Sequence, residues 1–226
     1  MSLQPYYQDD WATIYHGDCK NFLQVIDRAD LLLTDPQYGI EIGESNRQDD
    51  DCTHLHKKGY LHSRDTYDEF VNDIVPRLNE WIDLIGRAII FSGPHIHEQR
   101  KPVAIGGIYN QAAIGRTPWG SKNFLPILFY GSPPNLAGTH RPTVFNSTRA
   151  SDKNGHPCPK PIEWINWLIV SYSLNTDTII DPFTGSGTTL VAAKQLNRKS
   201  IGIEIEEKYC EIAANRLRQE VLDLSI

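Results

Sequence analysis

Short apolar runs that end at turn residues recur along the chain. A run of this kind, closed by Asp-Pro, Gly-Pro or a charged residue, is typical of a buried strand in a parallel sheet. The pattern predicts strands over residues 30–34, 87–92, 178–180 and 200–205.

Between these runs the apolar residues follow a helical spacing. In the longest segment, 66–85, Phe70, Ile74, Leu78 and Trp81 fall on one face, and Pro76 predicts a kink. Helices are predicted over residues 19–27, 66–85, 161–174, 187–196 and 207–220. Strands that alternate with helices predict a doubly wound α/β fold, in which a mostly parallel sheet carries helices on both faces. Ligands in such folds bind where the parallel strands end.

Two polar stretches do not fit this alternation. Residues 40–65 are rich in Asp, His and Lys, and residues 131–159 are rich in Pro, Asn, Thr, Ser and Gly, so both are predicted to be loops. The chain has 226 residues, which suits a single domain. Its sequence shows neither an apolar run of membrane length nor a leader-like start, and its four cysteines are scattered. A cytoplasmic protein without membrane contact is therefore expected.

The charge is unevenly distributed. The whole chain has a formal net charge of −6, yet residues 87–160 contain 9 Lys and Arg against 2 Asp and Glu. A basic middle between acidic ends is compatible with one surface that faces a polyanion, and equally with solvated side chains that cluster by chance.

The first motif that indicates chemistry begins at Asp181 and reads DPFTGSGTT. It follows a predicted strand and opens a helix, so Gly185 and Gly187 allow a tight turn and the close approach of a ligand. Glu204 ends the next strand, 19 residues after Gly185, where a carboxylate can bind ribose hydroxyls. The loop has no Lys, and Leu190 stands where a dinucleotide motif has its third glycine. A nucleoside ligand without a pyrophosphate is expected.

The second motif, Asp35-Pro36-Gln37-Tyr38, also ends a strand. The Asp35 carboxylate and the Pro36 carbonyl can accept hydrogen bonds from an amino group, and Tyr38 can stack on a planar base. A capping Asp followed by a turn proline would explain the same four residues. A third motif, HPCPKP over residues 156–161, precedes a helix.

Together these motifs resemble the DNA amino-methyltransferases that modify N6 of adenine or N4 of cytosine, in the permuted order with the catalytic motif first. The resembling segments are residues 15–38, with YHGD before the DPPY-type motif, and residues 156–217, with the HPxxKP-like, DPFxGSGTT and GIE motifs. The resemblance implies a seven-stranded, Rossmann-like methyltransferase sheet and a single domain over residues 1–226. Within this domain, residues at about 40–65 are expected to form a long loop, and residues at about 131–155 a small target-recognition insert.

The resemblance also implies roles for individual residues. Asp35, Pro36 and Tyr38 would hold a target base that has been flipped out of double-stranded DNA. S-adenosylmethionine would be the cofactor, with Glu204 on its ribose, Asp18 on its adenine and Lys160 near its methionine end. The remaining cofactor site would be formed by Asp181, Phe183, Gly185 and Gly187.

An Asp at the start of the catalytic motif favours adenine N6 over cytosine N4 within this family. Gln37 stands where the family usually has Pro, which relaxes the turn and adds an N–H donor. N4-cytosine methylation, methylation of RNA or of a protein amide, and a non-catalytic DNA-binding protein remain the alternatives. A homodimer and a partner restriction enzyme are both compatible with the sequence.

The basic middle predicts contacts with DNA phosphates. The residues expected to make them are Arg100, Lys101, Arg116, Lys122, Arg141, Arg149 and Lys153. Trp119 could contact nucleic acid or plug the end of a strand, and the structural role is favoured. Cys52, His54 and His56 could bind zinc, but their spacing matches no standard finger, so no metal is expected.

Overall fold

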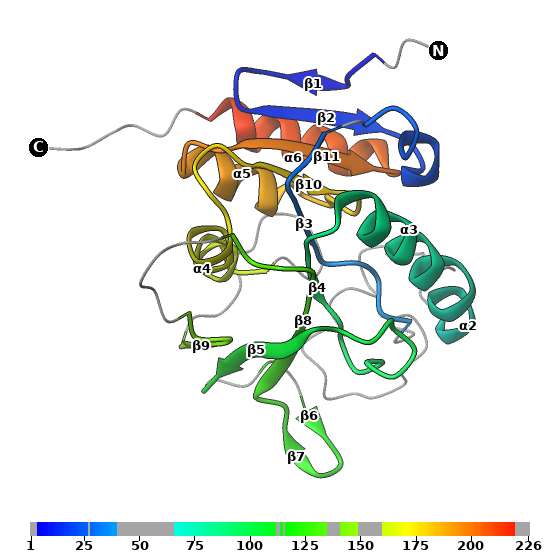
Figure 1. Ribbon diagram of the computed structural model, residues 1–226, viewed down its shortest axis with the longest axis vertical. Helices are drawn as coiled ribbons and strands as arrows, with labels where there is room; N and C mark the ends of the chain where they lie inside the picture. Colours follow the sequence, from blue (N-terminus) through cyan, green and yellow to red (C-terminus); the bar gives the residue numbers. More distant parts are fainter. Residues whose placement is uncertain are drawn as a thin grey trace, which may run out of the picture.

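The fold is built around one large, strongly twisted sheet with helices on both faces (Figure 1). The computed structural model describes residues 4–26, 28–39, 66–111, 114, 116–134, 141–148 and 160–219. Within these ranges the sheet has nine strands. In spatial order they are β1 (Tyr7–Gln8), β2 (Ala12–His16), β11 (Lys199–Glu204), β10 (Thr178–Asp181), β3 (Leu31–Thr34), β4 (Ala88–Phe91), β8 (Phe124–Tyr130), β5 (Ala104–Asn110) and β9 (Val144–Ser147).

The directions of the strands place the functional residues on one edge. Strands β2, β11, β10, β3 and β4 are parallel, so they end on the same side of the sheet. This side is called the carboxyl rim, and the opposite side the amino rim. Strand β8 is antiparallel to both β4 and β5. The connection from β5 to β8 therefore leaves from the carboxyl rim and returns to it.

The predicted mixed, mostly parallel α/β architecture is confirmed, and the four predicted strands are β3, β4, β10 and β11. The sheet has nine strands rather than seven, because the short strands β1 and β9 extend its two edges. Strand β9 lies within the stretch 131–159 that was predicted to be a loop, and it pairs in parallel with β5.

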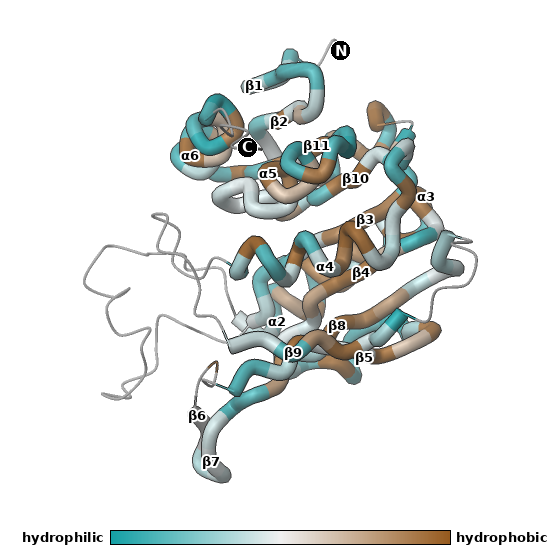
Figure 2. Tube along the Cα trace, turned by 90° about the vertical axis from the view of Figure 1, so that its left-hand side faces the viewer, coloured by the Kyte–Doolittle hydropathy of each residue, from teal (hydrophilic) through white to brown (hydrophobic). Residues whose placement is uncertain are grey.

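Helices cover the two faces of the sheet. One face packs against η1 (Cys19–Phe22), η2 (Phe70–Ile74) and α3 (Val75–Ile85), with Trp81 fully buried between them. The other face packs against α4 (Ile162–Tyr172), α5 (Thr188–Gln195) and α6 (Glu207–Arg218). Figure 2 shows the hydrophobic residues of β3 and β4 at the centre of these layers. None of the helices in the described ranges is long and apolar enough to cross a membrane.

The kink predicted at Pro76 takes the form of a π turn. A short helix, α2 (Tyr67–Glu69), leads into the π-helical segment η2, in which the N–H of Val75 donates to the carbonyl of Phe70, and α3 follows. Pro76 lies in the first turn of α3, directly after the π-helical segment. The predicted helix over 19–27 is a single 3-10 turn, η1.

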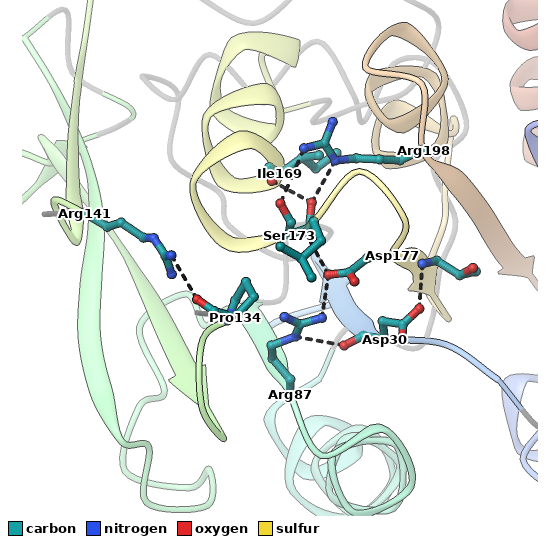
Figure 3. A network of polar contacts seen from close by, with 10 residues as sticks. Asp30, Arg87, Pro134, Arg141, Ile169, Ser173, Asp177 and Arg198 are labelled. Atoms are coloured by element: carbon teal, nitrogen blue, oxygen red, sulfur yellow. Dashed lines mark hydrogen bonds and ion pairs between the residues drawn. The ribbon is translucent and has the colours of Figure 1, made fainter. Parts of the chain in front are cut away.

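A polar network ties the strands together at the amino rim, away from the predicted site (Figure 3). Arg87 donates to the Asp30 carbonyl at 2.9 Å and to the Asp177 carboxylate at 2.6 Å. The Asp30 carboxylate accepts the backbone N–H of Thr178 at 2.8 Å. These contacts join the starts of β3, β4 and β10, and so fix the relative positions of the strands that carry the motifs.

Candidate active site at the carboxyl rim

Asp35 lies directly after β3, and its carboxylate is held from two sides. Oδ1 accepts the hydroxyl of Tyr38, and Oδ2 accepts the ammonium of Lys160 at 2.6 Å. Lys160 comes from the HPxxKP-like motif, just before α4. The fold thus brings together two motifs that are 125 residues apart in the sequence. The resemblance implies a place for Lys160 near the cofactor; the structure shows it paired with the carboxylate of Asp35.

The ring of Tyr38 lies against the turn that follows β4. Gly93 has a φ of 57°, and a Cβ at this position would lie only 2.5 Å from Cγ of Tyr38. Glycine therefore both permits the left-handed turn and makes room for the ring. Lys160 Nζ lies 5.4 Å from the centre of the Tyr38 ring and 5.8 Å from that of Phe91. From the sequence, Gly93 marks only the end of a strand, because its contact with Tyr38 is a tertiary one.

Asp181 ends β10, next to the end of β3, and is buried. Its Oδ1 accepts the hydroxyl of Thr34 at 2.6 Å and the backbone N–H of Phe183 at 3.1 Å. Burial raises the pKa of Asp181 to about 6; hydrogen bonds from Thr34, Thr189 and the Phe183 backbone oppose that rise, and the nearby negative charge of Asp35 adds to it. Two carboxylates that both precede Pro thus lie side by side at the rim.

Glu204 supports the glycine loop that follows Asp181. Its Oε2 accepts the N–H of Gly185 at 2.7 Å, and its Oε1 accepts the N–H of Glu206 at 2.9 Å. Burial raises the pKa of Glu204, and these two N–H groups act against that rise. Gly187 has a φ of 79°, and a Cβ there would lie 2.7 Å from Cβ of Ala213, so the loop packs directly on α6. Each carboxylate oxygen keeps lone-pair capacity for a further donor.

Arg216 on α6 holds the same loop from the other side. Its Nη1 donates to the Ser186 carbonyl at 2.6 Å, to the Ser186 hydroxyl at 3.3 Å and to the Thr188 hydroxyl at 3.1 Å. Arg216 lies outside the HPxxKP-like, DPFxGSGTT and GIE motifs of the sequence. Its position three residues after Ala213, on the helix face that packs on the loop, is the signal that could have indicated it.

Asp18 lies at the same rim, after β2. Gly17 donates its N–H to the Glu204 carbonyl at 2.9 Å, which places Asp18 next to the end of β11. The Asp18 carboxylate caps η1 through the N–H of Lys20 at 3.0 Å and accepts Arg77 at 2.8 Å. Asp18, Asp35, Asp181 and Glu204, which the sequence analysis selected separately, are therefore gathered along one edge of the sheet.

The predicted phosphate contacts do not form one surface. Arg100 pairs with Asp83, and its carbonyl accepts the hydroxyl of Tyr130 from the amino-rim end of β8. Arg141 donates to the Pro134 carbonyl at 2.9 Å, also beyond that end of β8. Lys101 is exposed, next to Arg100. These three residues lie toward the amino rim.

Two of the other predicted contacts, Arg116 and Lys122, belong to segments at the carboxyl rim. The backbone of Arg116 is in β6, in the connection from β5 to β8. Lys122 precedes β8 at this rim, and burial and the positive charge of Lys160 lower its pKa. Arg149 and Lys153 lie outside the described residues.

The candidate zinc ligands Cys52, His54 and His56 lie outside the described residues. Within the ranges that are described, no three His, Cys, Asp or Glu side chains are grouped as metal ligands would be. His95 packs its ring on Tyr67 and Phe70, with centroids 5.0 and 5.7 Å away.

Comparisons with known proteins agree with the motifs. A family model described as DNA methylase, for enzymes of the N6 and N4 types, matches residues 119–215. The type II methyltransferase M.HpaI of Haemophilus parainfluenzae is 37% identical over 100 residues, which are 42% of this chain and 32% of that protein. M.ScaI of Streptomyces caespitosus is 39% identical over 115 residues, 51% of this chain and 36% of its own length. The matched part thus spans about a third of these relatives.

Solved structures share the fold over nearly the whole chain. The complex of M1.HpyAVI with S-adenosylmethionine has a TM-score of 0.61 and 18% identity, and covers 92% of this chain and 100% of that one. The cytosine-N4-specific PvuII DNA methyltransferase has a TM-score of 0.65 and 15% identity, and covers 100% of this chain and 91% of its own. At this identity the likeness shows the fold. The family model and the curated relatives, each matching only part of the chain, support the resemblance of its motifs to the DNA methyltransferases of the N6-adenine and N4-cytosine types.

Proposed function

We propose that this protein transfers a methyl group from S-adenosylmethionine to N6 of an adenine in DNA. The observation that carries the proposal is the place of Asp35. A carboxylate suited to an amino group lies at the end of β3, in the strand next to the glycine loop and buried carboxylate of β10. A methyl donor in one half of this edge would face an amino acceptor in the other half.

The residues along β10, β11 and β2 suit a nucleoside cofactor. Glu204 would accept the ribose hydroxyls, Asp18 would contact the adenine ring, and Asp181, Phe183, Gly185 and Gly187 would line the site. Gly185 and Gly187, both at positive φ, close the turn of the loop, and two backbone N–H groups orient the Glu204 carboxylate. When bound, S-adenosylmethionine supplies an electrophilic methyl group on a sulfonium. The complex of M1.HpyAVI with this cofactor, on the same fold, supports the assignment.

Asp35 and Pro36 would act on the target amine. The lone pair of an exocyclic amine is conjugated with its ring, so the nitrogen is a poor nucleophile. A carboxylate and a carbonyl that accept its two hydrogens favour a pyramidal nitrogen with an available lone pair. The target atom is inaccessible within a duplex, so the base would be flipped out and stacked on Tyr38. Positioning and electrostatics then supply most of the acceleration.

Lys160 would hold the carboxylate of Asp35 in position for this contact with the amine. An ammonium 2.6 Å from Oδ2 fixes the orientation of the carboxylate, while the carboxylate oxygens retain capacity for the amine. Gln37 is half-buried in the same turn, with Pro36 buried before it and Tyr38 held after it. These neighbours would compensate for the fixed φ that a second proline provides.

The choice of adenine rests on Asp35 at the start of the motif. Cytosine N4 is the alternative, and the similarity of the fold to a cytosine-N4-specific enzyme keeps it open. RNA and protein amides carry amino groups of related chemistry. In each case the catalytic residues would be the same, and the methylated product would differ.

The first prediction concerns Asp35. We expect the wild-type protein to form N6-methyladenine in mixed-sequence duplex DNA, detected by mass spectrometry of the nucleosides. Asp35→Ala should lower the rate at least 100-fold, roughly the effect of removing one transition-state contact, and leave the Kd for S-adenosylmethionine within about threefold. Asp83→Asn, an exposed carboxylate on α3, is the control and should keep the wild-type rate. If the product is N4-methylcytosine, the target base is cytosine and not adenine. If Asp35→Ala remains active, the proposed mechanism is wrong.

The second prediction concerns Arg216. Arg216→Ala should free the Ser186–Thr188 turn and raise the Kd for S-adenosylmethionine about 10-fold, since charge-assisted hydrogen bonds contribute on the order of 1.5 kcal/mol. Arg216→Lys should retain part of the affinity. The control is Arg218→Ala, at the same end of α6, with an expected change below about twofold. Isothermal titration calorimetry measures all three. Equal Kd values for the wild type and Arg216→Ala would mean that the loop does not depend on this contact.

The third prediction concerns pH. With a pKa of about 6 in the free protein, Asp181 is mostly protonated at pH 5 and ionised at pH 7.5. A cationic cofactor favours the ionised form, so its affinity should increase as pH rises through 6. The Kd at pH 5 should be about 10-fold weaker, because only about a tenth of Asp181 is then ionised. Asp181→Asn keeps an acceptor for Thr34 and should flatten this profile; an unchanged pH slope in the variant would argue against Asp181 as the responsible group.

A further inference from the structure

A small hairpin projects from the sheet and presents a tryptophan. Strands β6 (Arg116–Thr117) and β7 (Gly120–Ser121) pair antiparallel, with Pro118 and Trp119 in the turn between them. The side chain of Trp119 is 99% exposed. The structural role favoured from the sequence, a plug at the end of a strand, is therefore wrong. Figures 1 and 2 both show the hairpin extending beyond the rest of the fold.

The hairpin is anchored at the rim that carries Asp35. It lies in the connection from β5 to β8, which leaves and rejoins the sheet at the carboxyl rim. Its base is closed by hydrogen bonds from the Asn110 N–H to the Asn123 carbonyl at 2.8 Å and from the Ile114 N–H to the Lys122 carbonyl at 2.7 Å. The Asn123 side chain also donates to the Asn110 carbonyl at 2.8 Å. The arm thus starts next to Lys122, at the same rim of the sheet as the Asp35–Lys160 pair.

The charge and the aromatic content of this segment match a nucleic acid. From residue 99 to 151 the sequence contains no Asp or Glu, and Arg116 and Lys122 lie on either side of Trp119. At the base of the hairpin Tyr109 and Phe124 face each other across β5 and β8, and are 43% and 41% exposed. Aromatic rings interleaved with cations are the combination with which proteins bind unstacked bases and the phosphates between them.

We propose that the β6–β7 hairpin is a DNA-contacting arm, and that Trp119 stacks on a base of the substrate. The inference rests on the proposed function and adds to it a contact outside the catalytic motif. A base that is flipped toward Asp35 leaves its neighbours without a stacking partner. An indole held on a short arm at the same rim can replace that partner, and stacking accepts any base because each has a π face.

The test uses the intrinsic fluorescence of the 226-residue protein. Of its five tryptophans, Trp81 and Trp164 are buried, and Trp119 is the most exposed of the large apolar side chains described. Stacking on a base quenches indole emission. A short single-stranded DNA of mixed sequence should therefore quench the wild-type protein, and Trp119→Phe should lose most of this quenching while its Kd stays within about threefold. Trp119→Ala should raise the Kd about 10-fold, as expected when one stacked base is lost.

Trp11→Phe is the matched control. Trp11 is 37% exposed and lies in the turn between β1 and β2, at the other edge of the sheet, so its removal should leave both the Kd and the DNA-dependent quenching unchanged. If the wild type binds DNA and transfers methyl groups, but Trp119→Ala binds DNA as tightly as the wild type, the proposed stacking of Trp119 is wrong and the proposed function stands. If the wild type neither binds DNA nor methylates it, the proposed function fails and the arm with it.

Discussion

The site depends on the pairing of β3 with β10. These strands are far apart in the sequence, yet Leu31 and Leu32 pair with Ile179 and Ile180, and the hydrogen bond from Thr34 to Asp181 closes the pair at the carboxyl rim. From this pair the chain proceeds to β4 on one side and to β11 on the other. A parallel sheet opens a crevice where its winding reverses in this way. Asp35 falls on one side of the reversal, and the glycine loop on the other.

Electrostatics divides the rim into two parts. On the side of β10 and β11, the buried carboxylates Asp181 and Glu204 have raised pKa values, because burial disfavours their charged forms. On the side of β3 and β8, Lys160 pairs with Asp35, and the positive charge of Lys160 lowers the pKa of Lys122. A cationic cofactor suits the first part. An anionic nucleic acid that presents a base suits the second, and methyl transfer needs the two ligands at their common boundary.

The sequence predicted the parts of the fold that are specified locally. Buried runs closed by Asp-Pro or Gly-Pro identified β3, β4 and β10, and the spacing from Gly185 to Glu204 placed the next strand.

Strands β5 and β8 were not predicted, for a physical reason. Gly106 and Gly107 weaken the strand signal of β5, but a Cβ on Gly106 would lie 1.9 Å from the Thr143 carbonyl oxygen, and one on Gly107 would lie 2.4 Å from the Phe124 ring. Pro126 weakens the signal of β8 in the same way. Tertiary contacts also explain why Gly93 and Arg216 were missed and why Arg100 and Arg141 lie toward the amino rim.

The central claim is that a methyl donor and a target amine meet at the β3–β10 boundary. A crystal structure of the protein with S-adenosylhomocysteine and adenosine tests this most directly. The account predicts the cofactor ribose hydroxyls within hydrogen-bond distance of Glu204, and the adenosine amino group within hydrogen-bond distance of Asp35 and the Pro36 carbonyl. A cofactor bound away from Glu204, or a nucleoside whose amino group does not reach Asp35, would contradict it.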